Sequence, residues 1–295
     1  MTGYLLTLFL CLITASSRVL LKKGMRDSNP LTGMTYSLLI GVLFLGIYAV
    51  PRMISQWQDL QLKGLLIFIG IGFIAPPVVR YLTYVGIDKI GASRSDPLRS
   101  VQPLFALVFS GFFLKEQVSI LIWIAACMIL AGAFLISRQN NSVHEKKYSK
   151  FDLLYPLLAA LIAGVITNYR KYGMSFLPDP IIAAFVAAFS ALIVFSTFLL
   201  ITGKYKQIVL TKDSKKFFLI SGGLTAFTDI LDLWALQLSQ VQIVAPLLGA
   251  TPLFVVLLSS LFLKKEESIG LKTWLGAGLI FVAIQLILYQ VTRSV

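Results

Sequence analysis

Runs of predominantly apolar residues recur from one end of the sequence to the other, separated by short polar stretches. A run of about 20 residues, folded as a helix that rises 1.5 Å per residue, crosses a hydrocarbon layer roughly 30 Å thick. The runs of this kind are Tyr4–Leu21, Leu31–Val50, Gly64–Ile87, Ala92–Leu114, Ile120–Ile136, Leu153–Tyr172, Ile181–Ile201, Lys216–Leu238, Ile243–Leu263 and Leu271–Val291. The pattern therefore predicts an all-α membrane protein with ten transmembrane helices.

Composition agrees with this pattern. Of the 295 residues, 57% are hydrophobic and only 13% are charged, whereas roughly 45–50% and about 25% are usual in soluble proteins. The mean hydropathy is +0.84. A soluble protein of this length needs more polar surface than the chain supplies, so we expect no sizeable soluble domain.

Shifting the sequence by 149 residues aligns short motifs of its first half with motifs of its second half. The aligned motifs are Lys22-Lys23-Gly24-Met25 with Lys171-Tyr172-Gly173-Met174, Pro97 with Pro246, Pro103-Leu104-Phe105 with Pro252-Leu253-Phe254, and Phe113-Leu114-Lys115 with Phe262-Leu263-Lys264. The offset predicts a duplication, with repeats 1–149 and 150–295 of five helices each. Because five is odd, the second repeat is expected to be inverted relative to the first. Inverted repeats around a central cavity are a recurring plan of secondary transporters.

Four prolines stand at matched positions of this repeat. Pro97 and Pro103 lie in the fourth predicted span, and Pro246 and Pro252 lie in the ninth. Each proline removes a helical hydrogen bond, and backbone freed in this way is tolerated in a membrane where neighbours satisfy it or where it lines a wet cavity. We predict that the four prolines break these two helices and act in gating. The alternative is that they only kink the helices for packing.

Charged and polar residues also lie inside the predicted spans, where an Arg or Asp costs roughly 2.5–3.5 kcal/mol on insertion scales. Such residues usually face the interior of a helix bundle or water, and they mark substrate pathways. The residues predicted to bind substrate are Arg18, Arg80, Tyr84, Arg94, Arg99 and Gln102 in the first half and Asn168, Asp229, Asp232 and Trp234 in the second.

The balance of these charges suggests the chemistry of the substrate. The four arginines share one side of the predicted bundle with a single acid, Asp96, and guanidinium groups left in a cavity suit a phosphate or carboxylate. We therefore expect a small anionic or zwitterionic substrate, with Asp229 and Asp232 holding an amino group or a coupling proton. In the alternative, the charges pair within the protein and keep the helices in register. Those pairs would be Arg99–Asp96, Arg80–Asp232 and Arg170–Asp229.

Two pairs of segments carry a family resemblance: Gly91–Phe105 with Phe113–Glu116, and Ala245–Phe254 with Phe262–Glu266. Through them the whole chain resembles the drug/metabolite transporter superfamily, EamA type. In the family's pattern a glycine precedes the glutamate that follows the fourth span. In this sequence that glutamate is Glu116, and Lys115 stands at the glycine position. The resemblance implies two five-helix halves and a cavity lined by the first, third, fourth, sixth, eighth and ninth spans. Members carry amino acids, nucleotide sugars, sugar phosphates, amines or lipid-linked sugars, so the resemblance does not select a substrate.

Other classes of protein are excluded by what the sequence lacks. Its one histidine, His144, lies in a polar stretch, and its two cysteines, Cys11 and Cys127, lie in apolar runs without CxxC spacing. These features argue against metal sites and histidine-dependent catalysis. No GxxxxGK[ST] motif is present. The sequence therefore predicts neither an enzyme nor a bound cofactor. The basic residues that give the net charge of +13 flank the predicted membrane spans, so we do not interpret them as a nucleic-acid-binding surface.

The expected function is a secondary transporter that works by alternating access in a lipid bilayer, as a monomer or homodimer. Coupling to a proton or to an exchanged solute stays open. We expect the protein to lie in a prokaryotic cytoplasmic membrane. Loops rich in Lys and Arg usually lie on the cytoplasmic side, and their distribution here would place both termini outside, whereas the resemblance implies both termini inside. The alternative functions are a flippase for a lipid-linked phosphate or sugar phosphate, and an amino-acid or amine exporter that uses Asp229 and Asp232.

Overall fold

The computed structural model describes residues 2–24, 28–90, 95, 98–137, 149–262 and 271–293. Within these ranges the chain is helical almost throughout and contains no β-strand. Seven helical segments are long and apolar enough to cross a membrane, and three further apolar helices are shorter. The described part of the chain therefore belongs to the all-α class and has the helix lengths of a membrane protein.

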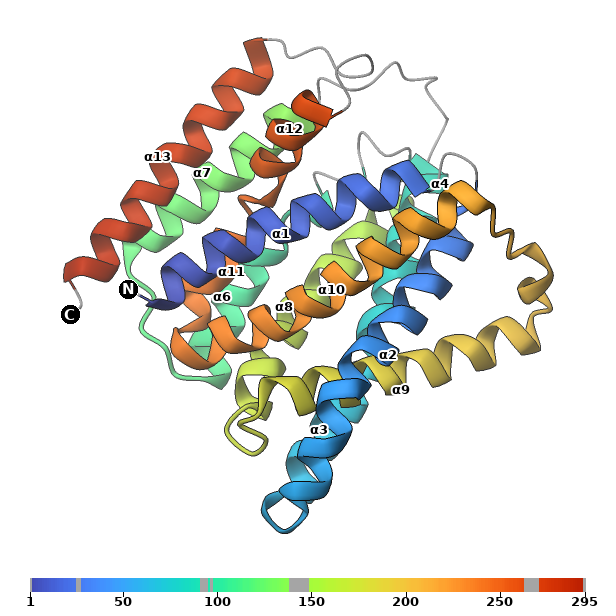
Figure 1. Ribbon diagram of the computed structural model, residues 1–295. Helices are drawn as coiled ribbons and strands as arrows, with labels where there is room; N and C mark the ends of the chain where they lie inside the picture. The colour runs from blue at the N-terminus through green and yellow to red at the C-terminus, as the bar shows by residue number, and fades with distance from the viewer. Residues whose placement is uncertain are drawn as a thin grey trace. The chain divides into compact units, whose positions relative to one another are not determined.

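The α-helices are labelled in Figure 1, with shorter 3-10 and π-helical turns between some of them. Their bounds are α1 (Thr2–Gly24), α2 (Pro30–Ser55), α3 (Leu62–Ile74), α4 (Arg80–Ile90), α6 (Gln102–Phe113), α7 (Ile120–Ser137), α8 (Leu154–Gly173), α9 (Pro180–Ile201), α10 (Lys212–Leu238), α11 (Val241–Leu248), α12 (Thr251–Phe262) and α13 (Leu271–Arg293). Most of them match the predicted spans to within a few residues, because long apolar runs are the strongest signal of a membrane helix.

The predicted ninth span is interrupted in the structure. Gly249 and Ala250 separate α11 from α12, and Pro252 stands in the first turn of α12. Proline is tolerated there because the first amides of a helix have no intrahelical acceptor. The hydroxyl of Thr251 donates a 2.6 Å hydrogen bond to the Leu248 carbonyl, which satisfies one carbonyl at the end of α11.

Two other predicted spans also depart from a single straight helix. In the fourth, α6 begins only at Gln102, after a turn at Ser100 and Val101. In the third, a π-helical turn, Ala75–Val79, lies between α3 and α4 and holds two consecutive prolines. In a π-helical turn the hydrogen bonds span five residues instead of four, so the regular helical ladder is interrupted. Prolines fit such an interruption because they have no amide hydrogen to donate.

Contacts divide the chain into two compact units. Unit 1 consists of Met1–Cys11, Val78–Asn168 and Leu238–Val295, and unit 2 consists of Leu12–Pro77 and Tyr169–Gln237. Each unit draws on both halves of the sequence. The division into 1–149 and 150–295 concerns the sequence repeat and stays a prediction.

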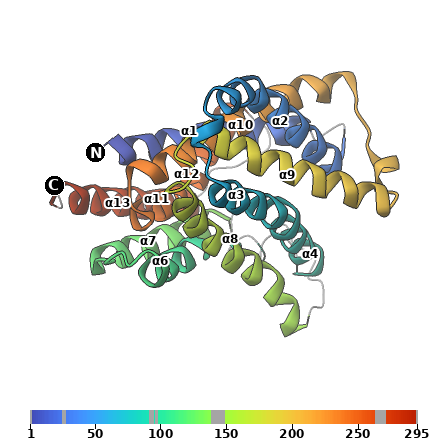
Figure 2. The ribbon, with the colours of Figure 1, turned by 90° about the horizontal axis from the view of Figure 1, so that it is seen from below.

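In unit 1, α7 and α13 lie side by side along their length (Figures 1 and 2). Their backbones touch at two glycines: a Cβ added to Gly132 would lie 2.6 Å from the Gly276 carbonyl oxygen. Small residues at a crossing allow close approach and dispersion contact in a membrane, where no hydrophobic force draws helices together. Ile280 and Ile284 of α13 extend the contact into a buried cluster, and the Tyr4 hydroxyl donates to the Ile284 carbonyl at 3.1 Å.

In unit 2, α9 packs against both α2 and α3. Gly72 of α3 lies directly on α9, where an added Cβ would be 2.3 Å from the Ala187 carbonyl oxygen. The helices α2 and α9 begin in the same way, with an Asn29-Pro30 and an Asp179-Pro180 pair. In each pair the first side chain accepts from a backbone amide of the first turn and the proline stands at N1, which is the capping pattern that starts a helix sharply.

The other side of α2 faces α10, and residues 12–24 of α1 also pack on α10 in this unit. Tyr36 of α2 stacks on Phe218 of α10, with ring centroids 6.4 Å apart. The Ser17 hydroxyl on α1 donates to the Ser221 carbonyl at 3.0 Å and lies 2.9 Å from the Thr225 hydroxyl. Polar contacts thus line α10 on the side of α1, along the helix that also carries Asp229 and Asp232.

Candidate functional site

Arg170 contacts two aspartates in unit 2. It stands in the last turn of α8, and Asp229 and Asp232 lie on α10. The Arg170 Nη1 atom is 2.5 Å from Asp232 Oδ2, and its Nη2 atom is 4.0 Å from Asp229 Oδ1. Residues three apart share one face of a helix, so a single guanidinium reaches both carboxylates.

The three charged groups differ in their exposure. The side chain of Asp232 is 13% exposed, that of Arg170 is 25% exposed and that of Asp229 is 40% exposed. The second carboxylate oxygen of Asp232, Oδ1, is buried and has no hydrogen-bond partner among the described residues. When all three groups are ionised, the cluster carries one negative charge in excess. It can therefore accept a cation or a hydrogen-bond donor at its carboxylates.

Neighbouring contacts fasten the end of α8, and the chain between α8 and α9, to the end of α10. Lys171 donates from Nζ to the Leu236 carbonyl at 2.5 Å, and Gln237 donates from Nε2 to the Pro178 carbonyl at 3.0 Å. Trp234, two residues after Asp232, is 48% exposed. The cluster is thus held on a fixed pair of helix ends, with one aromatic side chain of the same helix left uncovered.

In unit 1 the two interrupted spans lie against each other. A Cβ added to Gly249, at the end of α11, would lie 3.4 Å from Pro103 Cγ, at the start of α6. At the opposite ends, Glu116 after α6 accepts hydrogen bonds from the first residues of α11. The two helices therefore run antiparallel, and the two breaks are neighbours.

Polar side chains lie next to the break before α6. The Arg99 guanidinium donates to the Gln102 amide oxygen at 2.6 Å, and both side chains are partly buried. Asn168 of α8 is buried, and its Nδ2 donates to the carbonyls of Ala106 and Gly164, each at 3.0 Å. Its Oδ1 is buried without a hydrogen-bond partner among the described residues. Unit 1 therefore places one guanidinium and one unused acceptor along the first turns of α6.

The remaining predicted site residues are placed as follows. Arg18 is exposed on α1 in unit 2, and Arg80 and Tyr84 belong to α4, although their side chains fall outside the described part of the structure. Pro246 lies within α11. Arg94 and Pro97 lie outside the described residues.

Two groups of the predicted residues come into contact. Asp229 and Asp232 meet through Arg170, and Arg99 meets Gln102. The pairing alternative assigned Arg170 to Asp229 alone, yet the shorter contact is with Asp232. The reason is the shared helix face of the two aspartates, which lets one arginine bind both.

Two residues were absent from the predicted site. The sequence predicts Arg170 only as a pairing partner, although two aspartates at helical spacing indicate that one basic group can serve both. Glu116 enters the sequence pattern only as part of a turn motif. Its partners are 125 and 126 residues away along the chain, and no local pattern could have revealed them.

The comparison with protein families decides what kind of membrane protein carries these charges. The profile of the EamA-like transporter family matches residues 1–138 and residues 150–289. The chain belongs to the EamA-like transporter family. This membership agrees with the drug/metabolite transporter resemblance and, together with the membrane-length helices, marks an integral membrane protein. The EamA family points to a transporter rather than an enzyme.

Relatives of this EamA chain are also named as transporters. It is 25% identical over 158 residues to "Uncharacterized transporter YdfC" of Bacillus subtilis, a match that covers 52% of this chain and 50% of that protein. It is 25% identical over 140 residues to "Uncharacterized transporter sll0355" of Synechocystis sp., covering 48% of this chain and 42% of that protein. The matched region thus spans about half the length of these relatives or less.

One crystal structure of a protein is similar over nearly the whole chain. The TM-score is 0.77 at 16% sequence identity, and the match covers 99% of this chain and 98% of that chain. At this identity the likeness concerns the fold alone.

Proposed function

We propose that the protein is a secondary transporter that moves a small zwitterionic or anionic metabolite across a prokaryotic cytoplasmic membrane by alternating access. Ten spans, arranged as two inverted repeats around a cavity, are part of the proposal. The paired family matches support it, as do the interrupted helices at corresponding places in the two halves. Inverted repeats with broken helices at the substrate site are typical of secondary transporters.

The observation that carries the proposed substrate class is the contact of Arg170 with Asp229 and Asp232. Ionisable groups on membrane helices are costly and mark substrate or ion pathways. A zwitterion can exchange with the internal ion pair, because its ammonium group replaces the guanidinium beside Asp232 while its carboxylate binds Arg170. Both partners of the internal pair are then satisfied again, so neither charge is left alone in the membrane.

The other predicted residues keep proposed roles. Arg18, Arg80, Arg94 and Arg99 are proposed anion-binding groups, Tyr84, Gln102, Asn168 and Trp234 complete the proposed lining, and Pro97, Pro103, Pro246 and Pro252 are proposed gating positions. Asp229 is the second proposed amine or proton ligand because its carboxylate is the most exposed of the cluster. An amino-acid or amine exporter that depends on Asp229 and Asp232 is an alternative function, in which the two aspartates rather than the arginines bind the substrate.

The test is thermal stabilisation of the detergent-purified protein by matched compounds. Each carbon skeleton is offered as amino acid, carboxylate, phosphate, amine and alcohol. A ligand at 100 times its dissociation constant adds about 2.7 kcal/mol to the stability of the folded state, which is readily measured as a rise in melting temperature. We expect amino acids or phosphorylated amines to stabilise the protein and the corresponding alcohols to leave it unchanged.

Three variants assign the effect to residues. Asp229→Asn removes the second proposed ammonium ligand but leaves the Arg170–Asp232 contact, and Arg99→Gln removes one of the further proposed anion-binding groups, in unit 1. Arg52→Gln is the matched control, because Arg52 pairs with Asp179 at the exposed end of α2. We expect Asp229→Asn to abolish stabilisation by the zwitterion and Arg52→Gln to preserve it. Stabilisation by a plain amine equal to that by the amino acid would contradict a role for the arginines.

A flippase for a lipid-linked phosphate is the second candidate, and one observation favours it. An apolar groove of about 510 Å³ lies between α7 and the residues just before α6. It is lined by Leu98, Val101, Cys127, Leu130, Ala131, Phe134 and Leu135. Such a groove suits a hydrocarbon chain. The flippase predicts stabilisation that grows with the length of a prenyl or acyl chain, whereas the metabolite transporter predicts stabilisation by the head group alone.

A further inference from the structure

Glu116 links two helices of unit 1 that are far apart in the sequence. Its Oε1 accepts a hydrogen bond from the Val241 amide at 2.9 Å, and its Oε2 accepts one from the Gln242 amide at 3.0 Å. Each carboxylate oxygen thus accepts from one of the first two residues of α11. Since the amide end of a helix carries partial positive charge, a carboxylate is well suited to this place.

The chain after α6 is shaped to present this side chain. Lys115 has a φ of 54°, a left-handed conformation that turns the backbone back at the end of α6. The amides of Leu114 and Glu116 both donate to the Ser110 carbonyl, at 3.0 and 3.2 Å. The turn therefore satisfies the end of α6 and fixes Glu116 on the same few residues.

The start of α11 depends on this outside help. The side chain of its N-cap residue, Gln240, accepts no hydrogen bond from a backbone amide of the first turn. The Gln240 side-chain oxygen instead accepts from the Gln242 side-chain amide. The helix has eight residues, about 12 Å at 1.5 Å per residue. An isolated helix of this length is not stable, so contacts from other helices decide where it lies.

The far end of α11 is the helix break that meets the break before α6. Gly249 packs on Pro103, where a Cβ on the glycine would lie 3.4 Å from the proline ring, and Cys11 Sγ donates to the Leu247 carbonyl at 3.3 Å. The start of α11, which Glu116 holds, and the break at its far end are therefore one short helix apart.

We propose that Glu116 is a positioning residue that holds the two helix breaks of unit 1, at Ser100–Val101 and at Gly249–Ala250, in register with each other. The inference rests on the proposed function only for the gating role of those breaks. The geometry itself requires no substrate, and neither does its test.

Hydrogen–deuterium exchange of the full-length protein in lipid nanodiscs tests the proposal. Glu116→Gln keeps one acceptor oxygen and places an NH2 group against the second amide, and Glu116→Ala removes both acceptors. Asp179→Ala is the control at a helix start in unit 2, because Asp179 Oδ1 accepts hydrogen bonds from the Ile181 and Ile182 amides of its own helix, α9. Exchange is compared over residues 98–104, 180–184 and 241–252.

Glu116→Gln is expected to speed exchange about tenfold at the start of α11 and also across both breaks, with a larger effect in Glu116→Ala. Asp179→Ala is expected to speed exchange at residues 180–184 and leave both breaks unaltered. An increase confined to residues 241–244 would overturn the proposal, because Glu116 would then be a local cap only. No increase, or an equal increase throughout both units, would overturn it as well. If no compound of the thermal-stabilisation test stabilises the protein, the transport proposal is affected. The exchange experiment can still be interpreted, because it uses no ligand.

Discussion

The two units satisfy their charged groups in different ways. In unit 2 the guanidinium of Arg170 is bound by the carboxylates of Asp232 and Asp229. In unit 1 the carboxylate of Glu116 is bound by two backbone amides, and the guanidinium of Arg99 donates to the neutral amide of Gln102. Loss of one partner in unit 2 therefore leaves a charge behind, whereas loss of Glu116 in unit 1 leaves neutral amides behind.

This difference matters for how each unit can change shape. An ion pair between side chains can be replaced by a charged ligand without unfolding a helix, because a zwitterion supplies both charges. In unit 1 the partners of the Glu116 carboxylate are neutral backbone amides at the start of α11, so its replacement would need only a single negative charge.

The largest effect is expected from breaking the charge balance of unit 2. Arg170→Gln leaves Asp232, which is only 13% exposed, without its cation. Removing one partner of a buried pair costs about 3 kcal/mol or more, so the variant should unfold at a clearly lower temperature and at lower sodium dodecyl sulfate in a detergent titration.

The control for this variant restores neutrality. Arg170→Gln combined with Asp232→Asn removes both charges of the short contact and keeps groups that can hydrogen-bond, so it should regain more than half of the lost stability. Asp229 stays in both variants, and its partial exposure limits its cost. If the double variant is no more stable than the single one, the loss arises from the shape of the arginine rather than from the unpaired charge.

The second effect tests whether unit 1 depends on close backbone contact. Gly276→Ala places a Cβ 2.5 Å from the Gly132 carbonyl oxygen and 2.9 Å from Ile136 Cγ1, so α7 and α13 must move apart. Overpacking of this kind costs about 1–3 kcal/mol, measured as a lower melting temperature. Gly278→Ala is the control on the same helix, because nothing lies within 4 Å of its Cβ. Equal melting temperatures for the two variants would show that the glycine contact does not hold the pair together.

The comparison between units could be foreseen from the sequence only in part. The seven membrane-length helices followed from the length of the apolar runs, and Pro103 and Pro252, at which breaks were predicted, stand in the first turns of α6 and α12. The contact of Arg170 with Asp229 and Asp232 was within reach, because helical spacing put the two aspartates on one face. The bonds of Glu116 to Val241 and Gln242 were not, since their donors are backbone amides, and backbone groups leave no mark in a residue pattern.

The third effect concerns the turn that carries Glu116. Lys115 has a φ of 54°, which costs an L-residue roughly 1 kcal/mol or more. Lys115→Gly removes that cost, but glycine also gains freedom in the unfolded chain, so the net stabilisation should stay below about 1 kcal/mol. Lys115→Val should destabilise by about 1 kcal/mol, because a β-branched side chain tolerates this region poorly. The melting temperature of Lys115→Gly should therefore lie above that of the parent protein and that of Lys115→Val below it. A shift in the same direction for both variants would argue against strain at this turn.

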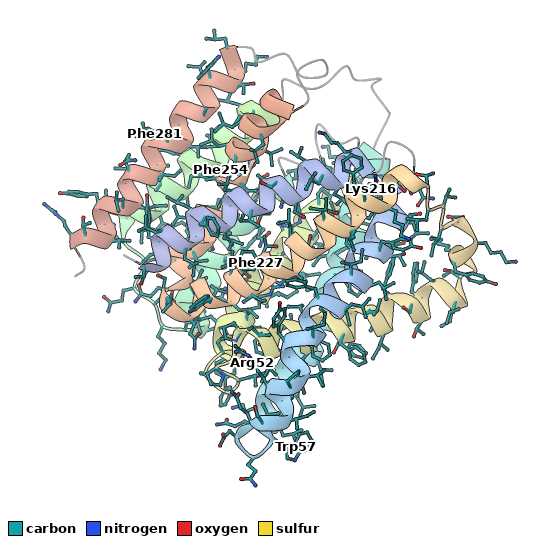
Figure 3. The ribbon with its side chains drawn as sticks, in the orientation of Figure 1. Arg52, Trp57, Lys216, Phe227, Phe254 and Phe281 are labelled. Atoms are coloured by element: carbon teal, nitrogen blue, oxygen red, sulfur yellow. The ribbon has the colours of Figure 1, made fainter. Side chains whose placement is uncertain are left out.

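The smallest effect is expected from an ion pair of unit 2 that lies at an exposed position. Arg52 lies toward the end of α2, before the turn that holds Trp57 (Figure 3), and its Nη1 atom is 3.0 Å from Asp179 Oδ2. The Arg52 side chain is 49% exposed, so water solvates the guanidinium whether or not the pair forms. Exposed pairs contribute about 0.2–1 kcal/mol, and Arg52→Gln should lower stability by no more than this.

Salt separates this pair from the cluster of Arg170. The Debye length shortens from about 10 Å at 0.1 M to about 3 Å at 1 M salt, so the small loss in Arg52→Gln should vanish between these concentrations. The loss in Arg170→Gln should persist, because the Asp232 side chain is only 13% exposed. Both pairs join an arginine to an aspartate within unit 2, and exposure is the property that differs most between them. An equal and salt-independent loss of stability in the two variants would mean that burial does not determine how much an ion pair contributes to the stability of this unit. The contrast with unit 1 would then depend only on which groups bind the charges.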